Sequence, residues 1–223
     1  MARKKLKRFE DNAQYKHVIE PTRDEAANGI ELRGKWREWF GRDGHLVVEL
    51  GCGKGEYTVA LARASSESLH VGVDIKGARL WYGATDIINE GLDNAAFLRT
   101  EINLIDGCFD EGEVDEIWIT FPDPQIKHKR TKHRLTHPDR LNQYSKLLKP
   151  GGVMHLKTDS AFLHGYTLGV LQNRKDFIVE AAYFDIDLQL TKKDSVLHSV
   201  RTYYEEMFRN KGKEITYLKA KKL

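Results

Sequence analysis

A short apolar segment followed by three evenly spaced glycines constrains the fold of this chain more than any other feature. Residues 46–50 (Leu-Val-Val-Glu-Leu) have the character of a strand that is buried on both faces of a parallel sheet. Gly51, Gly53 and Gly55 follow at once. Glycines let a backbone turn tightly and approach a ligand closely. Because residues 57–62 then open a helical pattern, the segment predicts a strand, a tight turn and a helix.

The same alternation of strands and helices continues along the chain. We expect further strands at 69–73, 96–98, 116–121 and 153–157, two more in the last fifty residues, helices near 36–40 and at 81–89, 137–148 and 161–172, and a turn at 149–152. This order predicts a doubly wound, seven-stranded, mostly parallel sheet of the Rossmann-like α/β class. The 223 residues suit one such domain over 31–223, preceded by a flexible basic arm over 1–30.

Several classes of protein are disfavoured by composition. The sequence has no run of about 18 apolar residues, so we expect no membrane span. Its N-terminus is basic without the apolar stretch of a signal peptide. The two cysteines, Cys52 and Cys108, suggest no disulfide framework, and no metal site is expected. A cytoplasmic protein fits best, as a monomer or a homodimer. A nucleophilic role for Cys52 is disfavoured because its neighbours suit backbone contacts.

An acidic residue stands at the end of each of the first five predicted strands. These residues are Glu49, Asp74, Glu101, Asp123 and Asp159. In open α/β sheets, ligands bind beyond the carboxyl ends of the strands, at the point where the strand order switches. The sequence therefore predicts that these acids border one ligand site.

The glycine spacing and its flanking acids indicate the ligand. A dinucleotide site receives a pyrophosphate at a helix N-terminus after G-x-G-x-x-G, whereas Glu49 and Glu56 flank this loop and would repel a diphosphate. They can instead accept hydrogen bonds from an ammonium group, as in the methionine part of S-adenosylmethionine. Asp74, after the next strand, stands where an acid accepts ribose hydroxyls. S-adenosylmethionine is thus favoured over NAD, and a dehydrogenase is the weaker alternative.

Basic residues are clustered although the net charge is only +3. The clusters lie at 3–8, 127–134 and 219–222, and the middle one follows a Phe-Pro-Asp-Pro turn at 121–124. The two prolines fix the backbone around Asp123 and hold out its carboxylate. A cationic loop beside a methyl-donor site implies a polyanionic methyl acceptor, which favours RNA.

Several motifs carry a family resemblance between about residues 45 and 210. They are Glu-Leu-Gly-Cys-Gly-Lys-Gly (49–55), Phe-Pro-Asp-Pro (121–124), the basic loop ending His-Arg-Leu (133–135), Lys-Thr-Asp (157–159) and Thr-Tyr-Tyr-Glu (202–205) before Phe208. In this order they resemble the bacterial tRNA (guanine-N7)-methyltransferases, the TrmB family, which have the class I methyltransferase fold. The resemblance implies methyl transfer from S-adenosylmethionine to N7 of guanine 46 in the tRNA variable loop.

The resemblance also implies roles for individual residues. Cofactor contacts are expected from Glu49, Gly51, Gly53, Gly55, Asp74, Glu101, Ile102 and Asp123, substrate contacts from Lys127, Asp159, Thr202 and Glu205, and RNA contacts from Lys129, Arg130, Lys132, His133 and Arg134. Asp123 and Asp159 are the candidate catalytic residues. The chain departs from the family pattern at Gln125, where a Trp is usual, and at Tyr203, where a charged or polar residue is usual.

The expected chemistry needs no strong general base. Guanine N7 carries a lone pair in the ring plane, so direct in-line transfer depends on positioning, and Asp123 or Asp159 would stabilise the cationic product ring. Asp159 or Glu205 would select guanine by accepting from its N1–H and N2–H groups. Two alternatives stay open: a non-catalytic RNA-binding protein on a methyltransferase scaffold, and methylation of another RNA base, such as adenine at N6.

Overall fold

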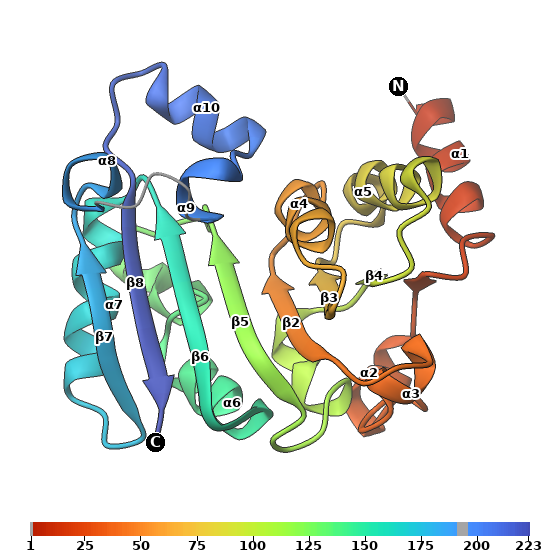
Figure 1. Cartoon of the computed structure of the whole chain (residues 1–223), viewed down its shortest axis with the longest axis horizontal. Helices are drawn as coiled ribbons and strands as arrows, with labels where there is room; N and C mark the ends of the chain where they lie inside the picture. Colours follow the sequence, from red (N-terminus) through yellow and green to blue (C-terminus); the bar gives the residue numbers. More distant parts are fainter. Residues whose placement is uncertain (1, 191–195) are drawn as a thin grey trace.

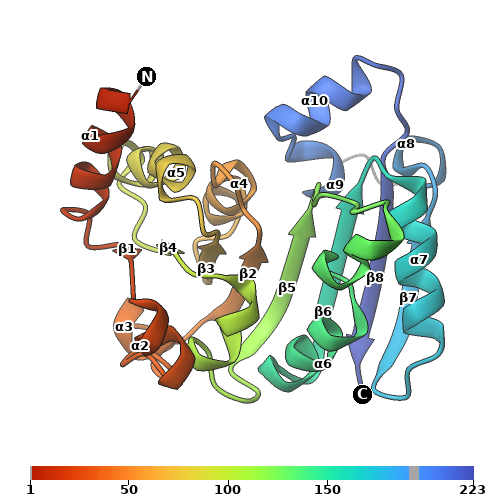
Figure 2. The same cartoon turned by 180° about the vertical axis from the view of Figure 1, so that it is seen from behind.

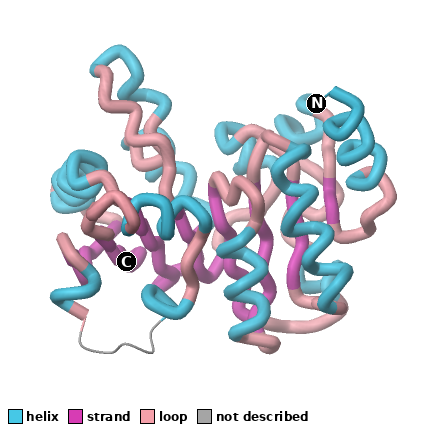
Figure 3. The backbone as a smooth tube through the Cα atoms, turned by 90° about the horizontal axis from the view of Figure 1, so that it is seen from above, coloured by secondary structure: helices cyan, strands magenta, loops and turns pink. Residues whose placement is uncertain are grey.

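The computed structural model describes residues 2–190 and 196–223, which form one eight-stranded sheet with helices on both sides (Figure 3). The strands are β1 (Val18–Ile19), β2 (His45–Leu50), β3 (Ser68–Val73), β4 (Ala95–Leu98), β5 (Val114–Thr120), β6 (Leu148–Thr158), β7 (Phe177–Tyr183) and β8 (Thr216–Lys222). Their order across the sheet is β1-β4-β3-β2-β5-β6-β8-β7. β8 runs antiparallel to both of its neighbours, and the other pairs are parallel.

Helices of different lengths connect these strands. The α-helices are α1 (Ala2–Asn12), α2 (Arg23–Asn28), α3 (Trp36–Phe40), α4 (Glu56–Ala64), α5 (Gly77–Glu90), α6 (Pro138–Leu147), α7 (Ala161–Gln172), α8 (Ile186–Gln189), α9 (Val196–Ser199) and α10 (Tyr203–Arg209), with 3-10 helices η1 (Ile102–Gly107) and η2 (His128–His133). Helices α6 and α7 lie behind the strands in Figure 1 and in front of them in Figure 2. Within the described residues, no helix has the length and apolar character that crossing a membrane requires.

The doubly wound, mostly parallel sheet is confirmed, and its strand count differs from the expected seven by one short edge strand. β1 consists of two residues, Val18 and Ile19, which pair in parallel with Phe97 and Leu98 of β4. So short a strand leaves no alternating pattern in the sequence. β6 also begins earlier than expected, at Leu148, so that the expected turn at 149–152 lies within a strand whose pairing with β5 shifts register.

The described part of residues 1–30, which we expected to form a flexible basic arm, contains the regular elements α1, β1 and α2. α1 packs against α5 through polar side chains: Asn12 donates to the carbonyl of Gly77 at 2.9 Å, and Trp81 donates to Asp11 at 2.8 Å. Arg8 lies over the ring of Tyr82, 4.5 Å from its centroid. Because these contacts come from distant residues, the polar sequence of the helix does not reveal them. The separation into an arm and a domain stays a prediction.

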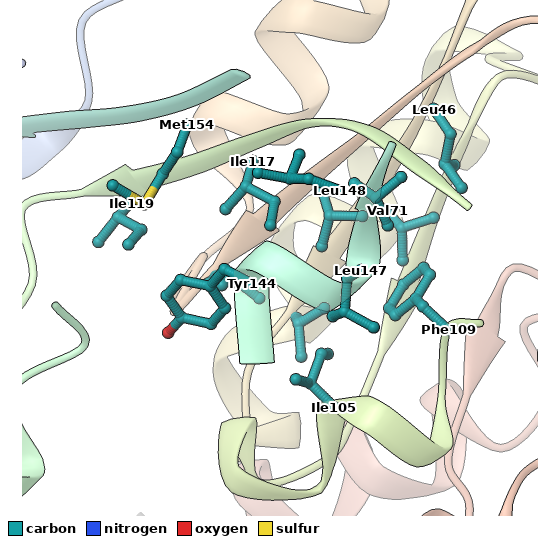
Figure 4. Packing of buried hydrophobic residues seen from close by; sticks show 14 of the residues in the cluster. Leu46, Val71, Ile105, Phe109, Ile117, Ile119, Tyr144, Leu147, Leu148 and Met154 are labelled. Carbon is teal, nitrogen blue, oxygen red and sulfur yellow. The ribbon is translucent and has the colours of Figure 1, made fainter. Parts of the chain in front are cut away.

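The apolar core lies between the strands and the helices that cover them (Figure 4). Residues from the strands, such as Leu46, Val71 and Ile117, pack with Tyr144 and Leu147 of α6. All five are at most 3% exposed. Burial of a large apolar side chain stabilises the fold by roughly 1.5–3 kcal/mol, so this core makes the sheet a rigid support for the loops at its edge.

The chain reverses its direction across the sheet between β2 and β5. From β2 it proceeds to β3 and β4 on one side, and β5 then pairs with the other side of β2. Glu49 is the register partner of Gly72 on one side and of Trp118 on the other. The connections after β2 and β5 therefore leave in opposite directions, which opens a crevice at their carboxyl ends.

Candidate functional site at the switch point

A cleft of about 760 Å³ occupies this crevice. Six parts of the chain line it: the glycine loop after β2, the end of β3, the Phe-Pro-Asp-Pro turn after β5, the end of the basic loop at His133 and Leu135, Asp159 after β6, and the segment around α10. Figure 1 shows α4 and α10 above the carboxyl ends of β2, β5 and β6, on opposite sides of this region. We call this cavity the main cleft.

The backbone N–H groups of the glycine loop are mostly satisfied within the protein. Gly51 and Cys52 donate to the carbonyl of Val73 at 2.8 and 3.1 Å, and Gly55 donates to the carbonyl of Cys52 at 2.8 Å. Gly53 donates to the carboxylate of Asp74 at 3.0 Å. A phosphate-binding loop keeps such groups available for its ligand. The loop geometry therefore opposes a pyrophosphate at this position.

The three glycines of the loop have different surroundings although each has a positive φ. A Cβ on Gly55 (φ +77°) would lie 2.3 Å from Cζ of Phe97, whereas a Cβ on Gly53 (φ +60°) would meet no atom within 4 Å. Gly51 and Gly53 line the main cleft, and Gly55 packs against β4 instead. Of these glycines, Gly53 thus leaves the most room for a bound molecule.

Glu49 lies at the floor of the main cleft and is 2% exposed. Its Oε2 accepts from the backbone N and the hydroxyl of Thr58 at 2.9 and 2.6 Å, and its Oε1 accepts from the Thr120 hydroxyl at 2.5 Å. Burial raises the pKa of Glu49 to about 7, and the hydrogen bonds from Thr120 and Thr58 oppose that shift. Since Oε1 has one hydrogen-bond donor and two lone pairs, it can accept from a ligand cation.

A second cavity of about 300 Å³ shares Gly51, Asp74 and His133 with the main cleft. Glu101 and Ile102, which follow β4, both line this second cavity. Glu101 forms an exposed ion pair with Arg23 at 2.7 Å. The acids at the ends of β2, β3 and β4 therefore border two connected cavities.

The Phe-Pro-Asp-Pro turn is held in a strained backbone conformation. Phe121 and Gln125 have φ values of +45° and +46°, a region that non-glycine residues seldom occupy. Asp123 accepts from the backbone N of Gln125 at 3.0 Å, and the N–H of Phe121 donates to the carbonyl of Lys157 at 2.8 Å. The turn thus holds Asp123 at the cleft in a fixed orientation.

The side of the main cleft formed by the turn and α10 carries aromatic rings. Phe121 stacks on Phe208 with centroids 6.1 Å apart, and both rings line the cleft together with Tyr204. We call these three residues the aromatic wall. Asp159 and Thr202 line the cleft with them, and burial raises the pKa of Asp159. In the sequence, Tyr204 and Phe208 stood out only as parts of one motif, without an individual role.

Most of the basic loop is exposed beside the main cleft. Lys127, Lys129, Arg130, Lys132 and His133 are all exposed, and His133 lines the cleft. Lys127 borders a third cavity of about 350 Å³, which shares Asp123 and Pro124 with the main cleft. The basic loop therefore places exposed cations next to the main cleft.

Arg134 does not fit the RNA contact expected for it, because its side chain is turned inward and 5% exposed. It donates to the carbonyl of Gln125 at 3.1 Å and lies over the rings of Phe162 and Tyr166, 4.8 and 4.4 Å from their centroids. This arginine fastens the basic loop to α7.

Glu205 also differs from its expected position. It is completely buried and forms an ion pair with Lys157 at 2.7 Å. It does not line the main cleft. A carboxylate with no exposed surface cannot accept a hydrogen bond from a substrate in the cleft, so a direct substrate contact by Glu205 is not supported.

Cys52 borders the main cleft, but burial raises the pKa of its thiol well above the ordinary value, and Glu49 and Asp74 raise it further. The thiol stays protonated and is a poor nucleophile. Within residues 2–190 and 196–223, no group of three or more histidine, cysteine or acidic residues could hold a metal ion.

Known proteins match this chain over most of its length. The family described as "Putative methyltransferase" matches residues 43–218. A tRNA (guanine-N(7)-)-methyltransferase of Christiangramia forsetii is 50% identical over 222 residues, which cover 99% of this chain and 98% of that protein. The chain belongs to the bacterial tRNA (guanine-N7)-methyltransferase family. It is therefore a methyltransferase.

Other relatives extend the match. The enzyme of the same name from Bacteroides thetaiotaomicron is 45% identical, covering 98% of this chain and 86% of that protein, and one from Listeria monocytogenes serotype 4b is 31% identical, covering 87% and 88%. Among solved structures, an antibiotic-related methyltransferase superposes with a TM-score of 0.63 at 17% identity, covering 89% of this chain and 98% of that chain. The 16S rRNA methyltransferase KamB superposes with a TM-score of 0.61 at 11% identity, covering 85% and 93%. These structures support the fold.

The different surroundings of Gly55 and Gly53 in the glycine loop predict different effects of substitution on stability. Gly55→Ala adds strain at a positive φ and forces a methyl group against Phe97, so it should lower the free energy of unfolding by about 2–5 kcal/mol. Gly53→Ala adds only the backbone strain, about 1–2 kcal/mol. Urea unfolding of both variants measures the difference, and equal losses would contradict the packing role assigned to Gly55.

Proposed function

We propose that this methyltransferase transfers a methyl group from S-adenosylmethionine to N7 of guanine 46 in the variable loop of tRNA, in the cytoplasm. The observation that carries the proposal is the main cleft, which has buried and half-buried acids on its glycine-loop side and the aromatic wall with Asp159 on the other. Exposed cations of the basic loop stand beside it. The names of the curated relatives support tRNA guanine as the acceptor.

The residues on the glycine-loop side of the main cleft fit S-adenosylmethionine. Glu49 has a free lone pair on Oε1 for the ammonium group, and the open face of Gly53 leaves room for the methionine part. Asp74 would accept from the ribose hydroxyls, and Glu101 with Ile102 would border the adenine in the second cavity. The cofactor would supply an electrophilic methyl group on its sulfonium.

The residues on the side of the aromatic wall fit guanine. A flat base can lie against the aromatic wall, where stacking on an aromatic side chain contributes about 1–3 kcal/mol per base. Asp159 can accept from the N1–H and N2–H groups of guanine. Adenine has a lone pair at N1, so it would leave this carboxylate unpaired, at a cost of about 1–3 kcal/mol. Asp159 is therefore the residue proposed to select guanine.

The protein contributes mainly orientation and charge. Because N7 needs no deprotonation, none of the cleft residues has to act as a general base. The strained turn holds Asp123, and the aromatic wall limits the rotation of the base, which favours a near-attack geometry. The ring gains a positive charge during the reaction, and the carboxylates of Asp123 and Asp159, which line the cleft, would stabilise that charge.

Two other functions have less support. The glycine loop has already used the N–H groups that an NAD pyrophosphate would need. Some solved structures with a similar fold are 16S rRNA (adenine(1408)-N(1))-methyltransferases, but at 16 to 18% identity they indicate the fold alone. A protein that binds RNA without catalysis would not need a cleft in which a buried carboxylate, Glu49, keeps a lone pair available for a ligand.

The proposed reaction is tested by incubating the protein with unmodified tRNA transcripts and labelled S-adenosylmethionine, and mapping the methylated atom. We expect 7-methylguanine at position 46 with the native chain. Asp159→Asn keeps the size of the side chain but loses the acceptor pair, so kcat/KM should fall about tenfold or more. Methyl groups on adenine, or on no base, would reject the proposal, and unchanged kcat/KM would remove Asp159 from it.

The raised pKa of Glu49 predicts a pH-dependent cofactor affinity. An ammonium group binds the ionised carboxylate, and Glu49 with a pKa of about 7 becomes protonated as the pH falls. Binding of S-adenosylhomocysteine should therefore weaken by about five- to tenfold between pH 7.5 and 6. Glu49→Gln should bind weakly at both values, without this dependence. Calorimetric titration measures the affinities, and a flat profile for the native chain would contradict the contact.

The basic loop predicts a salt-dependent RNA affinity. Lys129→Ala should weaken tRNA binding and reduce the slope of log K against log salt concentration by about 0.7–0.9. Lys175→Ala is the matched control, because that lysine is also exposed but precedes β7 at the opposite end of the sheet. Fluorescence anisotropy between 50 and about 200 mM salt measures both slopes. Equal slopes for the two variants would exclude Lys129 as a phosphate contact.

A further inference from the structure

A lysine lies fully buried beneath the segment that carries the aromatic wall. Lys157, near the end of β6, has 0% side-chain exposure. Its ammonium group donates to the carbonyls of Leu197 and Val200 at 2.7 and 3.1 Å and pairs with the carboxylate of Glu205 at 2.7 Å. Burial lowers the pKa of Lys157, and Glu205 opposes that shift. A charge in such a place is tolerated only with close partners.

The ion pair belongs to a longer network that reaches the surface. The other oxygen of Glu205 pairs with Arg209 at 2.9 Å, and Arg209 also contacts Asp187 of α8. The side chain of Asp187 is 47% exposed. Both oxygens of Glu205 are thus directed at cations, and neither faces the main cleft.

The residues that Lys157 contacts lie on both sides, in the sequence, of residues that line the cleft. They include Val200 before α10 and Glu205 within it. Thr202 and Tyr204 lie between these two points, and Phe208 lies one turn beyond Glu205; all three line the cleft. Thr202 also caps α10 by accepting from the N–H of Glu205 at 3.2 Å. Any shift of the ion pair therefore moves residues of the cleft.

We infer that Lys157 and Glu205 are positioning residues that act through α10 to place Thr202, Tyr204 and Phe208 against the substrate, without touching the substrate themselves. The inference rests on the proposed function for the identity of that substrate. It replaces the direct contact that the sequence motif suggested for Glu205. On the cofactor side, the hydrogen bonds that hold Glu49 and Gly53 involve neither Lys157 nor Glu205. Helix α4 does touch this region, because the Lys157 ammonium group lies 5.5 Å from the ring centroid of Tyr57 and the N–H of Tyr203 donates to Glu56 at 2.9 Å.

The pair is tested by a double-mutant cycle with Lys157→Met, Glu205→Met and the combined variant. Each single change removes half of the buried ion pair and leaves Glu205 with Arg209 alone, or Lys157 with two backbone carbonyls alone. KM for tRNA should therefore rise tenfold or more, while the Kd of S-adenosylhomocysteine stays within twofold. The double variant removes both charges, and Arg209 keeps Asp187, so most of the loss in KM should be recovered. Losses that multiply in the double variant, or a loss in the Glu205 variant alone, would show that Glu205 acts independently of Lys157.

A variant at the exposed end of the network tests the same role if substitution of Lys157 or Glu205 prevents folding. Asp187→Asn weakens the exposed end of the network and should raise KM for tRNA two- to fivefold. Glu206→Gln is its control, since Glu206 lies on the same helix but pairs with Arg201, outside the network. If the two variants give the same KM, the positioning role is overturned.

Amide hydrogen exchange separates this inference from the proposed function. Exchange at residues 203–209 should be faster in Asp187→Asn than in the native chain and in Glu206→Gln, with no change in α6. This result is expected with or without RNA. A native chain that fails to methylate tRNA rejects the proposed function alone, whereas unchanged exchange in α10 rejects the positioning role alone.

Discussion

The buried carboxylate of Glu49 joins the three elements that meet at the switch point of the sheet. It extends from β2 and accepts hydrogen bonds from Thr58 of α4 and Thr120 of β5. Those bonds fix the distance between the two strands whose connections diverge to form the main cleft. Because burial keeps the pKa of this acid near neutrality, the group that organises the floor of the cleft can also respond to a bound cation.

A second buried charge organises the opposite side. Lys157 extends from β6 and is held by Glu205 and by two backbone carbonyls. Glu49 is tied to the strands that carry the glycine loop and the turn, and Lys157 to the segment that carries most of the aromatic wall. Each side of the cleft therefore has its own buried charge, and the two sides meet where the N–H of Tyr203 in α10 donates to Glu56 of α4 at 2.9 Å.

The sequence was sufficient for the features that depend on local patterns. Apolar runs such as 46–50 and 69–73 predicted the parallel strands, and the acids after them lie around the cavities as expected. It was insufficient where a polar side chain obtains its partner from a distant element. Arg134 lies in a run of cations, but only the packing of α7 shows that it turns inward.

Contacts between distant segments are also the reason why the sequence did not predict α1 or the aromatic wall. The polar residues of α1 look unstructured until α5 provides partners for Arg8 and Asn12. Tyr204 and Phe208 approach Phe121 because the antiparallel strand β8 brings the C-terminal segment back beside β6. Contacts between residues so far apart in the chain leave no periodic signal in either segment.

A crystal structure of the protein with S-adenosylhomocysteine tests the central claim most directly, because it locates the cofactor without assuming a substrate. We expect the ammonium group within hydrogen-bond distance of Glu49 Oε1, the ribose hydroxyls at Asp74, the adenine between Ile102 and Glu101, and the sulfur facing the aromatic wall. A ligand bound outside the main cleft, or one whose ammonium group points away from Glu49, would contradict the account.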